Sequence, residues 1–256
     1  MLTGIDHIVI VVSDLDRAVT AFTRAGFTVT LGGRHNVGTH NALIGLADSS
    51  YIELIAFLDP VPGHPWFKAL ERGGGLVDFC MRTDDLETDV MKLRAAGAAI
   101  SDPATMTRDR PDGYRLKWDL AIPHPPDTGQ LPFLIRDETP RDERVPRKRS
   151  HLNGVTGLKR VTVAANDPFR AGKLLGSVSG AALSRQARTD LNAQGYSLEI
   201  GPHEIHWLTP NTPRTPLAEW LERRGPSPYS ATLYAPTSPR TPDDLLVMRA
   251  ARLDFE

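Results

Sequence analysis

The sequence has few of the features that mark secreted, membrane or zinc-binding proteins. Cys80 is the single cysteine among 256 residues, so neither an intrachain disulfide nor a cysteine-based zinc site can form. No apolar run approaches the length that crosses a bilayer. The first one, IVIVV, is too short for a signal-peptide core and follows Asp6 instead of a basic stretch. We therefore expect a cytoplasmic protein with no membrane partner.

An excess of charge of one sign is also lacking. Lys and Arg number 30 against 31 Asp and Glu, and the formal net charge of −1 gives no general attraction to nucleic acid. No GxSxG, P-loop or dinucleotide-binding fingerprint occurs, so we expect no nucleotide cofactor. The composition, 40% hydrophobic and 24% charged, fits a globular protein of one large or two modest domains whose partner is a small molecule.

Proline, in contrast, is frequent, and its clusters mark loops. The charged stretch RDETPRDERVPRKR (136–149) is predicted to be the most solvated part of the chain. We place a linker at residues 138–150, between a first half at 1–137 and a second half at 151–256.

One unit of sequence recurs along the chain. DHIVIVVSDLDRAVTAFTRAGF predicts a strand, a cap and a helix that ends at Gly26. Along the strand, Ile8 lies on one face and His7 on the other. Ser13, followed by Asp16, resembles a capping box at the helix start.

Later copies follow the same order. In VDFCMRTDDLETDVMKLRAAGAAI, Asp78 takes the place of His7, and in LKRVTVAANDPFRAGKLLG that place falls to Arg160. A fourth copy begins at PYSATLYAP and ends after a helix in TPDDLLVMRAARLDF. Each full unit is a strand, a helix and about three strands, and such units must pair to bury their sheets.

This arrangement resembles the vicinal-oxygen-chelate superfamily, and its glyoxalase-like group most closely. The matching stretches span most of residues 4–136: IDHIVIVVSDLDRAV, GGRHNVGTHNALIGL, YIELIAF, RDRPDGYRLKWDLAIP and LPFLIRD. The resemblance implies an α+β fold in which tandem βαβββ modules form curved mixed sheets around a cavity, with helices outside. Two modules would fill 1–137, and 151–256 would be a degenerate second half with a truncated last module.

The resemblance also implies a metal site at the first and last strands of each module. Those places hold His7 and Glu53 in the first module, and Asp78 and Phe133 in the second. Phe133 cannot coordinate, so the implied ligands are His7, Glu53 and Asp78, around one divalent ion (Zn, Fe, Mn or Ni). The alternative is a metal-free pair, in which desolvation raises the pKa of Glu53 and makes it a general base held by His7. A purely structural hydrogen bond between the two is a third reading.

The stretch GGRHNVGTHN supplies further candidates. We favour His40 as a third catalytic group over His35, because His40 opens the apolar run ALIGL. Asn41 and His35 are candidates for substrate binding, and Arg34 for a substrate carboxylate. The plain alternative is a hairpin whose imidazoles and arginine face solvent.

Trp118 alternates with Leu116 and Leu120, so it belongs either to the core or to a ligand platform.

These residues lead to two hypotheses of function. The first is a glyoxalase-like enzyme, a lyase, isomerase or oxygenase, acting on a small oxygenated molecule in the first half. The second is a metal-free small-molecule binding protein of the drug-sequestering kind. The second half would then serve packing or formation of a homodimer. Both hypotheses predict that His7 and Glu53 meet in the cavity, with His40 nearby.

Overall fold

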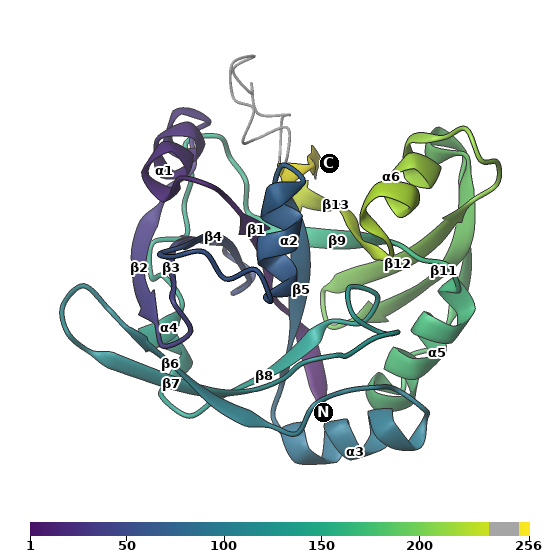
Figure 1. The fold of residues 1–256 in the computed structure, drawn as a ribbon, viewed down its shortest axis with the longest axis horizontal. Coiled ribbons are helices and arrows are strands. Elements are labelled where there is room, and N and C mark those ends of the chain that lie inside the picture. Colours follow the sequence, from purple (N-terminus) through teal and green to yellow (C-terminus); the bar gives the residue numbers. More distant parts are fainter. Residues whose placement is uncertain (236–250) are drawn as a thin grey trace.

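Eight strands of the first half close into a barrel in the computed structural model, which describes residues 1–235 and 251–256 (Figure 1). Around the barrel the strands follow the order β1-β4-β3-β2-β6-β7-β8-β5. Their bounds are β1 Leu2–Val11, β2 Thr30–His35, β3 Thr39–Gly45, β4 Tyr51–Phe57, β5 Gly75–Thr83, β6 Ala104–Asp109, β7 Arg115–Ala121 and β8 Phe133–Asp137. The helices of this half are α1 Leu15–Arg24, α2 Pro65–Glu71 and α3 Leu86–Ala95.

The repeated unit predicted from the sequence is confirmed by its helix caps. Asp14 caps α1 by accepting from the backbone N–H of Arg17 at 2.9 Å, and Asp85 does the same for α3. A carboxylate at this position satisfies a free N–H group and opposes the positive end of the helix dipole. The cap is therefore Asp14 and not Ser13, which corrects the capping-box prediction.

The alternation along β1 places its two faces as predicted. Ile8 and Ile10 join the large core outside the barrel, whereas Val9 and Val11 join the cluster inside it. The first strand of each module pairs with the last strand of the same module in parallel, and β1 pairs with β5 antiparallel. The two modules thus meet along β1 and β5, and they meet again where β2 pairs with β6.

The second half forms an open sheet of six strands, in the order β10-β11-β12-β9-β13-β14. Its elements are β9 Gly157–Ala164, α5 Pro168–Ser179, β10 Ser184–Arg188, the 3-10 turn η1 Thr189–Leu191, β11 Ala193–Ile200, β12 His203–Pro210, α6 Pro216–Arg224, β13 Ser227–Tyr234 and β14 Leu253–Phe255. Asp167 caps α5, and Pro168 lies in its first turn. The predicted fourth copy does not stop after its helix, because β14 follows and pairs with β13 in parallel. Its helical stretch lies outside the described residues.

Barrel and sheet share one apolar core. Residues from both, such as Ile5 and Phe79 of the barrel and Val161 and Trp207 of the sheet, belong to the same buried cluster. The indole of Trp207 also donates to the backbone carbonyl of Gln130 at 2.7 Å. The contact between barrel and sheet is stabilising because it removes apolar area of both from water.

The segment 138–150 between the halves is not uniformly solvated, which corrects the sequence-based expectation. It contains the short helix α4, Arg141–Arg144. Arg144 ends α4 with a side chain that is only 1% exposed, and Val145 is buried after it. The segment packs on the barrel instead of merely joining two parts.

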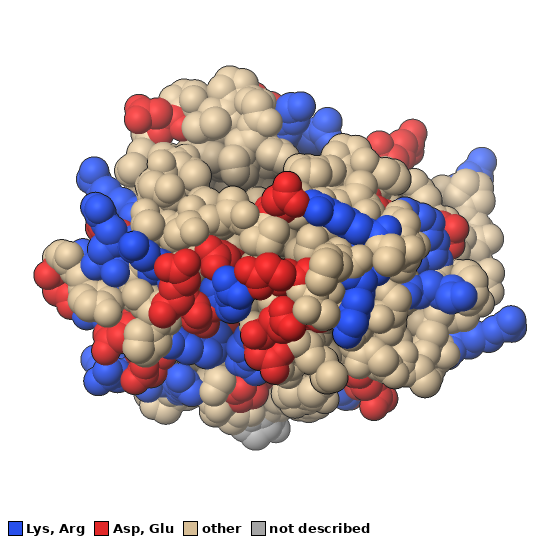
Figure 2. All heavy atoms as spheres, turned by 90° about the horizontal axis from the view of Figure 1, so that it is seen from below, with Lys and Arg blue, Asp and Glu red and all other residues tan. Residues whose placement is uncertain are grey.

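None of the helices in residues 1–235 and 251–256 has both the length and the apolar character of a membrane span. On the face shown in Figure 2, acidic and basic side chains lie next to each other.

Candidate active site

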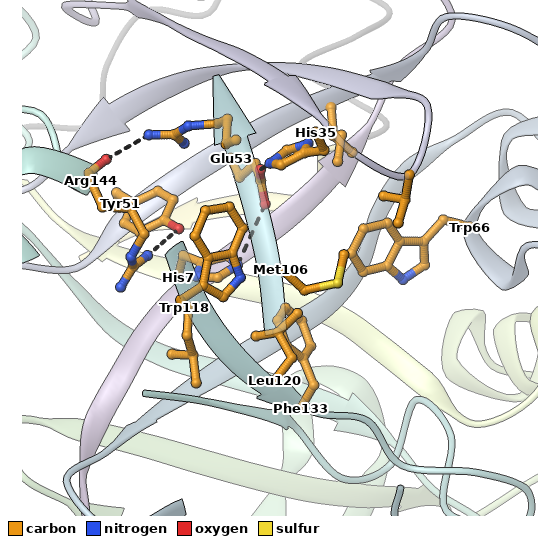
Figure 3. Close-up of a pocket in the computed structure, with 14 residues that line it drawn as sticks. His7, His35, Tyr51, Glu53, Trp66, Met106, Trp118, Leu120, Phe133 and Arg144 are labelled. Atoms are coloured by element: carbon orange, nitrogen blue, oxygen red, sulfur yellow. Dashed lines mark hydrogen bonds and ion pairs between the residues drawn. The ribbon is translucent and has the colours of Figure 1, made fainter. Parts of the chain in front are cut away.

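A cavity of about 70 Å³ lies inside the barrel (Figure 3). Its walls are largely apolar and come from several strands and α2: Trp66, Met106, Trp118, Leu120 and Phe133. Polar side chains gather at one part of it: His7, His35, Tyr51, Glu53, Arg108 and Arg144. A small, mostly apolar cavity with a few convergent polar groups is the usual form of a small-molecule site.

His7 and Glu53 meet in this cavity, as predicted. Nε2 of His7 lies 3.5 Å from Oε2 of Glu53, and both side chains are buried. The pairing of β1 with β4 sets His7 opposite Tyr51 and Val9 opposite Glu53, so the two polar residues lie one step apart on the inner face. Their meeting follows from the parallel register of the first and last strands of the module.

A second carboxylate holds the other side of the His7 ring. Nδ1 of His7 lies 2.7 Å from Oδ1 of Asp6, where β1 shifts register against β5. Burial by itself would raise the pKa of Asp6, but the charges of Arg144 and Arg141 outweigh it and keep that pKa well below its ordinary value. Asp6 is therefore ionised and can only accept, so Nδ1 of His7 donates to it. The ring also stacks on Tyr51, with centroids 4.5 Å apart.

The pKa of Glu53 is lowered, which corrects the prediction that desolvation raises it. Burial does act in the raising direction, but the imidazoles of His7 and His35 and the amide of Asn41 overcome it. Asn41 donates to Oε1 of Glu53 at 2.6 Å, and Nε2 of His35 lies 3.8 Å from the same oxygen. Glu53 is therefore a carboxylate at neutral pH, held among donors.

Asn41 has room to reach Glu53 because Gly32, at a register shift between β2 and β3, has no side chain. A Cβ at Gly32 would lie 2.0 Å from Oδ1 of Asn41, so a side chain there would displace the amide. The sequence-based choice of Asn41 as a site residue is consistent with this geometry, although its contact in the structure is with Glu53.

His35, and not His40, lines the cavity, which corrects the sequence-based preference for His40. His35 lines the cavity, its Nδ1 lies 2.9 Å from Oγ1 of Thr39, and burial lowers its pKa to about 4. His40 does not line the cavity; it pairs with Ala56, which belongs to the core outside the barrel. The physical reason is that the apolar residues after His40, such as Ala42 and Ile44, pack outside the barrel, and alternation puts His40 on their face.

Arg34 likewise does not face the cavity. It is exposed and pairs with His40 across the hairpin. Two arginines that the sequence analysis did not select line the cavity instead, Arg108 and Arg144. Met106 and Arg108 alternate along β6 and both face inward, which is the signal that could have identified Arg108. Arg144 had no such signal, because its charged surroundings in the sequence predict exposure.

Arg144 anchors the polar end of the cavity. Its guanidinium donates to Asp6 at 3.0 Å, to the hydroxyl of Tyr51 at 2.8 Å and to Asp137 at 2.9 Å. These contacts place two carboxylates and a hydroxyl around the buried charge of Arg144, as a buried guanidinium requires.

Trp118 belongs to the apolar cluster inside the barrel, as one of the two sequence readings predicted, and it also lines the cavity. Its ring meets that of His35 edge-on, with centroids 5.9 Å apart. Trp66 of α2 also lines the cavity.

A metal ion of the kind often found in this fold would need three converging donors. His7 and Glu53 are adjacent, but Asp78 accepts from the indole of Trp66 at 3.0 Å, and burial raises its pKa to about 7. Within the described residues, His7, Glu53 and Asp78 are not a group whose ligand atoms all lie within 4.8 Å of one another. Phe133 holds the fourth place that the resemblance implies for a ligand, and its ring lies at 71° to that of His7, with centroids 5.3 Å apart. As arranged, these side chains do not form a common ligand set.

One other group of potential donors gathers in the described part of the chain: Asp6, His7 and Cys80. Asp6 is already engaged by Arg144 and Arg141, and burial raises the pKa of the Cys80 thiol well above its ordinary value. A neutral thiol beside two guanidiniums is a poor cation site. Cys80 is a small buried residue of the barrel interior.

A barrel of two βαβββ modules around a cavity, with histidine and glutamate on the first and last strands of one module, defines a protein of the vicinal-oxygen-chelate fold. The chain belongs to the glyoxalase-like domain family, whose profile matches residues 5–178. No curated protein sequence matches it.

Three solved structures share the fold over nearly the whole chain. A hypothetical protein from Staphylococcus aureus is 17% identical, with a TM-score of 0.72 over 100% of this chain and 99% of that one. A triple mutant of 4-hydroxymandelate synthase from Streptomyces coelicolor is 14% identical, with a TM-score of 0.56 over 98% and 75%. A fusion protein of a xylose isomerase-like TIM barrel and 4-hydroxyphenylpyruvate dioxygenase is 13% identical, with a TM-score of 0.55 over 98% and 39%. At these identities the likeness establishes the fold alone.

Proposed function

We propose that this protein is an isomerase or lyase that moves a proton on a small oxygenated molecule in the barrel cavity. His7 is the group that takes and returns the proton, and Glu53 is its counter-charge. The observation that carries the proposal is the alignment of Asp6, His7 and Glu53, with one carboxylate at each nitrogen of the imidazole.

This alignment gives the two ring nitrogens different tasks. Nδ1 donates to the ionised Asp6, which fixes the ring and its tautomer. Nε2 faces the cavity beside Glu53. When Nε2 accepts a proton from a carbon next to a carbonyl group, the nearby Glu53 carboxylate stabilises the positive charge that forms on the ring. In an aldose–ketose isomerisation, the same proton returns from Nε2 to the neighbouring carbon, and the hydroxyl proton of the intermediate passes to the former carbonyl oxygen.

The role of Glu53 thus differs from the one first expected of it. A carboxylate whose pKa is lowered is a weaker base than one whose pKa is raised, so it suits charge stabilisation better than proton abstraction. An oxygenase reaction on this fold would need a metal centre, for which the side chains as arranged supply two of three donors. Proton transfer requires only groups already in the cavity.

A binding protein without turnover is the second candidate. The aromatic walls formed by Trp66, Trp118 and Phe133 favour it, because such walls hold apolar ligands without chemistry. The polar cluster beside those walls favours the enzyme, since a sequestering pocket has no need of an oriented imidazole.

Hydrogen exchange tests the proposal. The protein, treated with EDTA, is incubated in D₂O with hydroxyacetone, glycolaldehyde, lactaldehyde or pyruvate, and NMR follows deuterium entering at the carbon next to the carbonyl. We expect catalysed exchange with at least one of these probes. We expect His7→Gln to reduce it by about 10²–10⁴-fold, the usual contribution of a positioned acid–base group, and Glu53→Gln to reduce it less.

His206→Gln in the second half is the matched control and should leave exchange unchanged. Exchange that disappears with EDTA and returns with a divalent ion would replace this mechanism with metal chemistry. Saturable binding of probes without exchange would support the sequestering protein instead.

A further inference from the structure

Arg108 stands apart from the other buried charges of the barrel. Its residue is 3% exposed, and its guanidinium lines the cavity from β6, on the strand pair that joins the two modules. Burial lowers the pKa of this guanidinium from its ordinary value, which is the mark of a cation without a full set of partners.

The hydrogen bonds of Arg108 are few. Within residues 1–235 and 251–256, its one side-chain hydrogen bond runs from Nη2 to the backbone carbonyl of Arg144 at 3.0 Å. Its Nε is buried and finds no acceptor among these residues. No carboxylate oxygen of the same residues lies within 4 Å of its nitrogens.

Several other arginines in and beside the barrel are paired with carboxylates, whereas Arg34 is exposed and Arg82 bonds to the hydroxyl of Thr3. Arg144 contacts Asp6 and Asp137, Arg110 contacts Glu143, and the exposed Arg115 holds Asp109. Figure 2 shows the same mixing of acidic and basic side chains on one face of the surface. A cation kept inside the fold without an ion-pair partner is costly, because its lost hydration is not replaced. Arg108 also lines a second pocket, but the acidic side chains Asp112, Asp142 and Glu143 line that pocket and disfavour an anion there, so the barrel cavity is the place from which an anionic partner can come.

We propose that the cavity binds small carboxylates and that Arg108 holds the carboxylate group. A guanidinium presents its donors as a planar fork that matches a carboxylate, which favours an acid over a neutral ligand of the same shape. The rest of the ligand packs on Trp66 and Trp118, within a volume of about 70 Å³ that suits a short chain. Glu53 accepts from Asn41 and lies beside His7, and although its charge acts on Arg108 from across the cavity, the two form no ion pair within the described residues.

This inference rests on the proposed function in that it names the substrate class of the same cavity, but binding can be measured without turnover. Propionate and propionamide are the probes, because they share shape and differ in charge. The fluorescence of Trp66 and Trp118, which line the cavity, and isothermal titration calorimetry report binding. We expect saturable binding of propionate, and binding of propionamide at least tenfold weaker. Equal binding of the two, or of neither at concentrations up to the solubility of the amide, overturns the proposal.

Variants separate Arg108 from general electrostatics. Arg108→Gln should weaken propionate at least tenfold while leaving propionamide unchanged, and Arg108→Lys should recover part of the loss. Arg115→Gln, on the neighbouring strand β7, is the matched control and should bind propionate as the parent does. An Arg108→Gln protein that binds propionate normally refutes the assignment. The comparison of acid with amide on the parent protein stands even when the variant does not fold. Propionate binding without any hydrogen exchange would leave this inference intact and defeat the proposed function.

Discussion

The barrel and the open sheet are built from the same unit but treat their charged residues differently. In the barrel, β1 and β4 set His7 opposite Tyr51 and Val9 opposite Glu53. In the sheet, β9 and β12 set Arg160 opposite Glu204 and Thr162 opposite His206. Arg160 therefore stands where the barrel has His7, and His206 where it has Glu53. The backbone frame is the same, and the side chains decide what each copy can do.

In the sheet these side chains bind one another. Oε2 of Glu204 lies 3.1 Å from Nε2 of His206 and 3.2 Å from Nη1 of Arg160. In the barrel, two modules close around a cavity, and His7 and Arg108 line it. The comparison indicates that the site needs two features. The paired modules must close around a cavity, and polar side chains must keep groups that face this cavity.

The largest expected effect comes from removing the arginine at the polar end of the barrel. Arg144→Ala leaves Asp6, which is fully buried, with fewer partners, and should lower the free energy of unfolding by about 3–5 kcal/mol. Arg160→Ala in the sheet removes a more accessible ion pair and should cost about 1 kcal/mol. Urea unfolding of both variants at pH 7 measures the difference. Equal losses, with unchanged slopes against urea, would mean that the two regions do not differ in this way.

A smaller effect, opposite in sign, is expected at Asp78. Its pKa is raised to about 7 from 3.8 by burial, so the folded state holds a proton that the unfolded state has lost. Stability is therefore lost as pH rises from about 4 through 7. Asp78→Asn removes this penalty, and its stability relative to the parent should improve by about 2–3 kcal/mol between pH 4 and pH 8. Ser230 holds the corresponding place in the sheet, opposite Thr162 as Asp78 is opposite Val9. A Ser230→Ala protein should show no such pH-dependent change, and if Asp78→Asn shows none either, then Asp78 is ionised in the fold.

The smallest of the three expected effects concerns one histidine in each region, and it should have the same size in the barrel and in the sheet. Burial lowers the pKa of His35 to about 4 from 6.5, and that of His206 to about 4 as well. The unfolded state takes up these protons at higher pH, so stability falls as pH drops from 6.5 toward 4. His35→Gln should remove about 2 kcal/mol of the loss between pH 7 and pH 5, and His206→Gln a similar amount. Unfolding in urea at both pH values checks this; a variant that keeps the parent's full loss would show that its histidine is protonated in the native state.

The inner face of the first strand could be predicted because strand alternation is a local property. The resemblance to the vicinal-oxygen-chelate superfamily placed His7 and Glu53 on the first and last strands of one module, and alternation put both on the inner face, where they meet. The choice between His35 and His40 failed because β3 is buried on both faces over most of its length: Ala42 and Ile44 belong to the core outside the barrel, and Leu43 packs with Tyr51 and Val145. When both faces are apolar, hydrophobicity cannot tell the inner face from the outer.

The arginines were missed for a different reason. Arg144 can be buried because Asp6, 138 residues earlier in the chain, is its ion-pair partner inside the fold. Such long-range pairing leaves no trace in the local composition, where a charged run predicts solvent. Likewise, the lowering of the pKa of Glu53 depends on donors from three strands, whereas its position in an apolar stretch suggested only desolvation.

The pairing of Arg144 with the first strand has a consequence for synthesis of the chain. The last barrel strand ends at Asp137, but the guanidiniums that neutralise Asp6 come from Arg141 and Arg144. A nascent chain that has released all eight strands therefore still carries an uncompensated carboxylate in its barrel until α4 has emerged. For the same reason, a gene fragment that stops at the last barrel strand would omit Arg144, whose side chain is part of the barrel's interior.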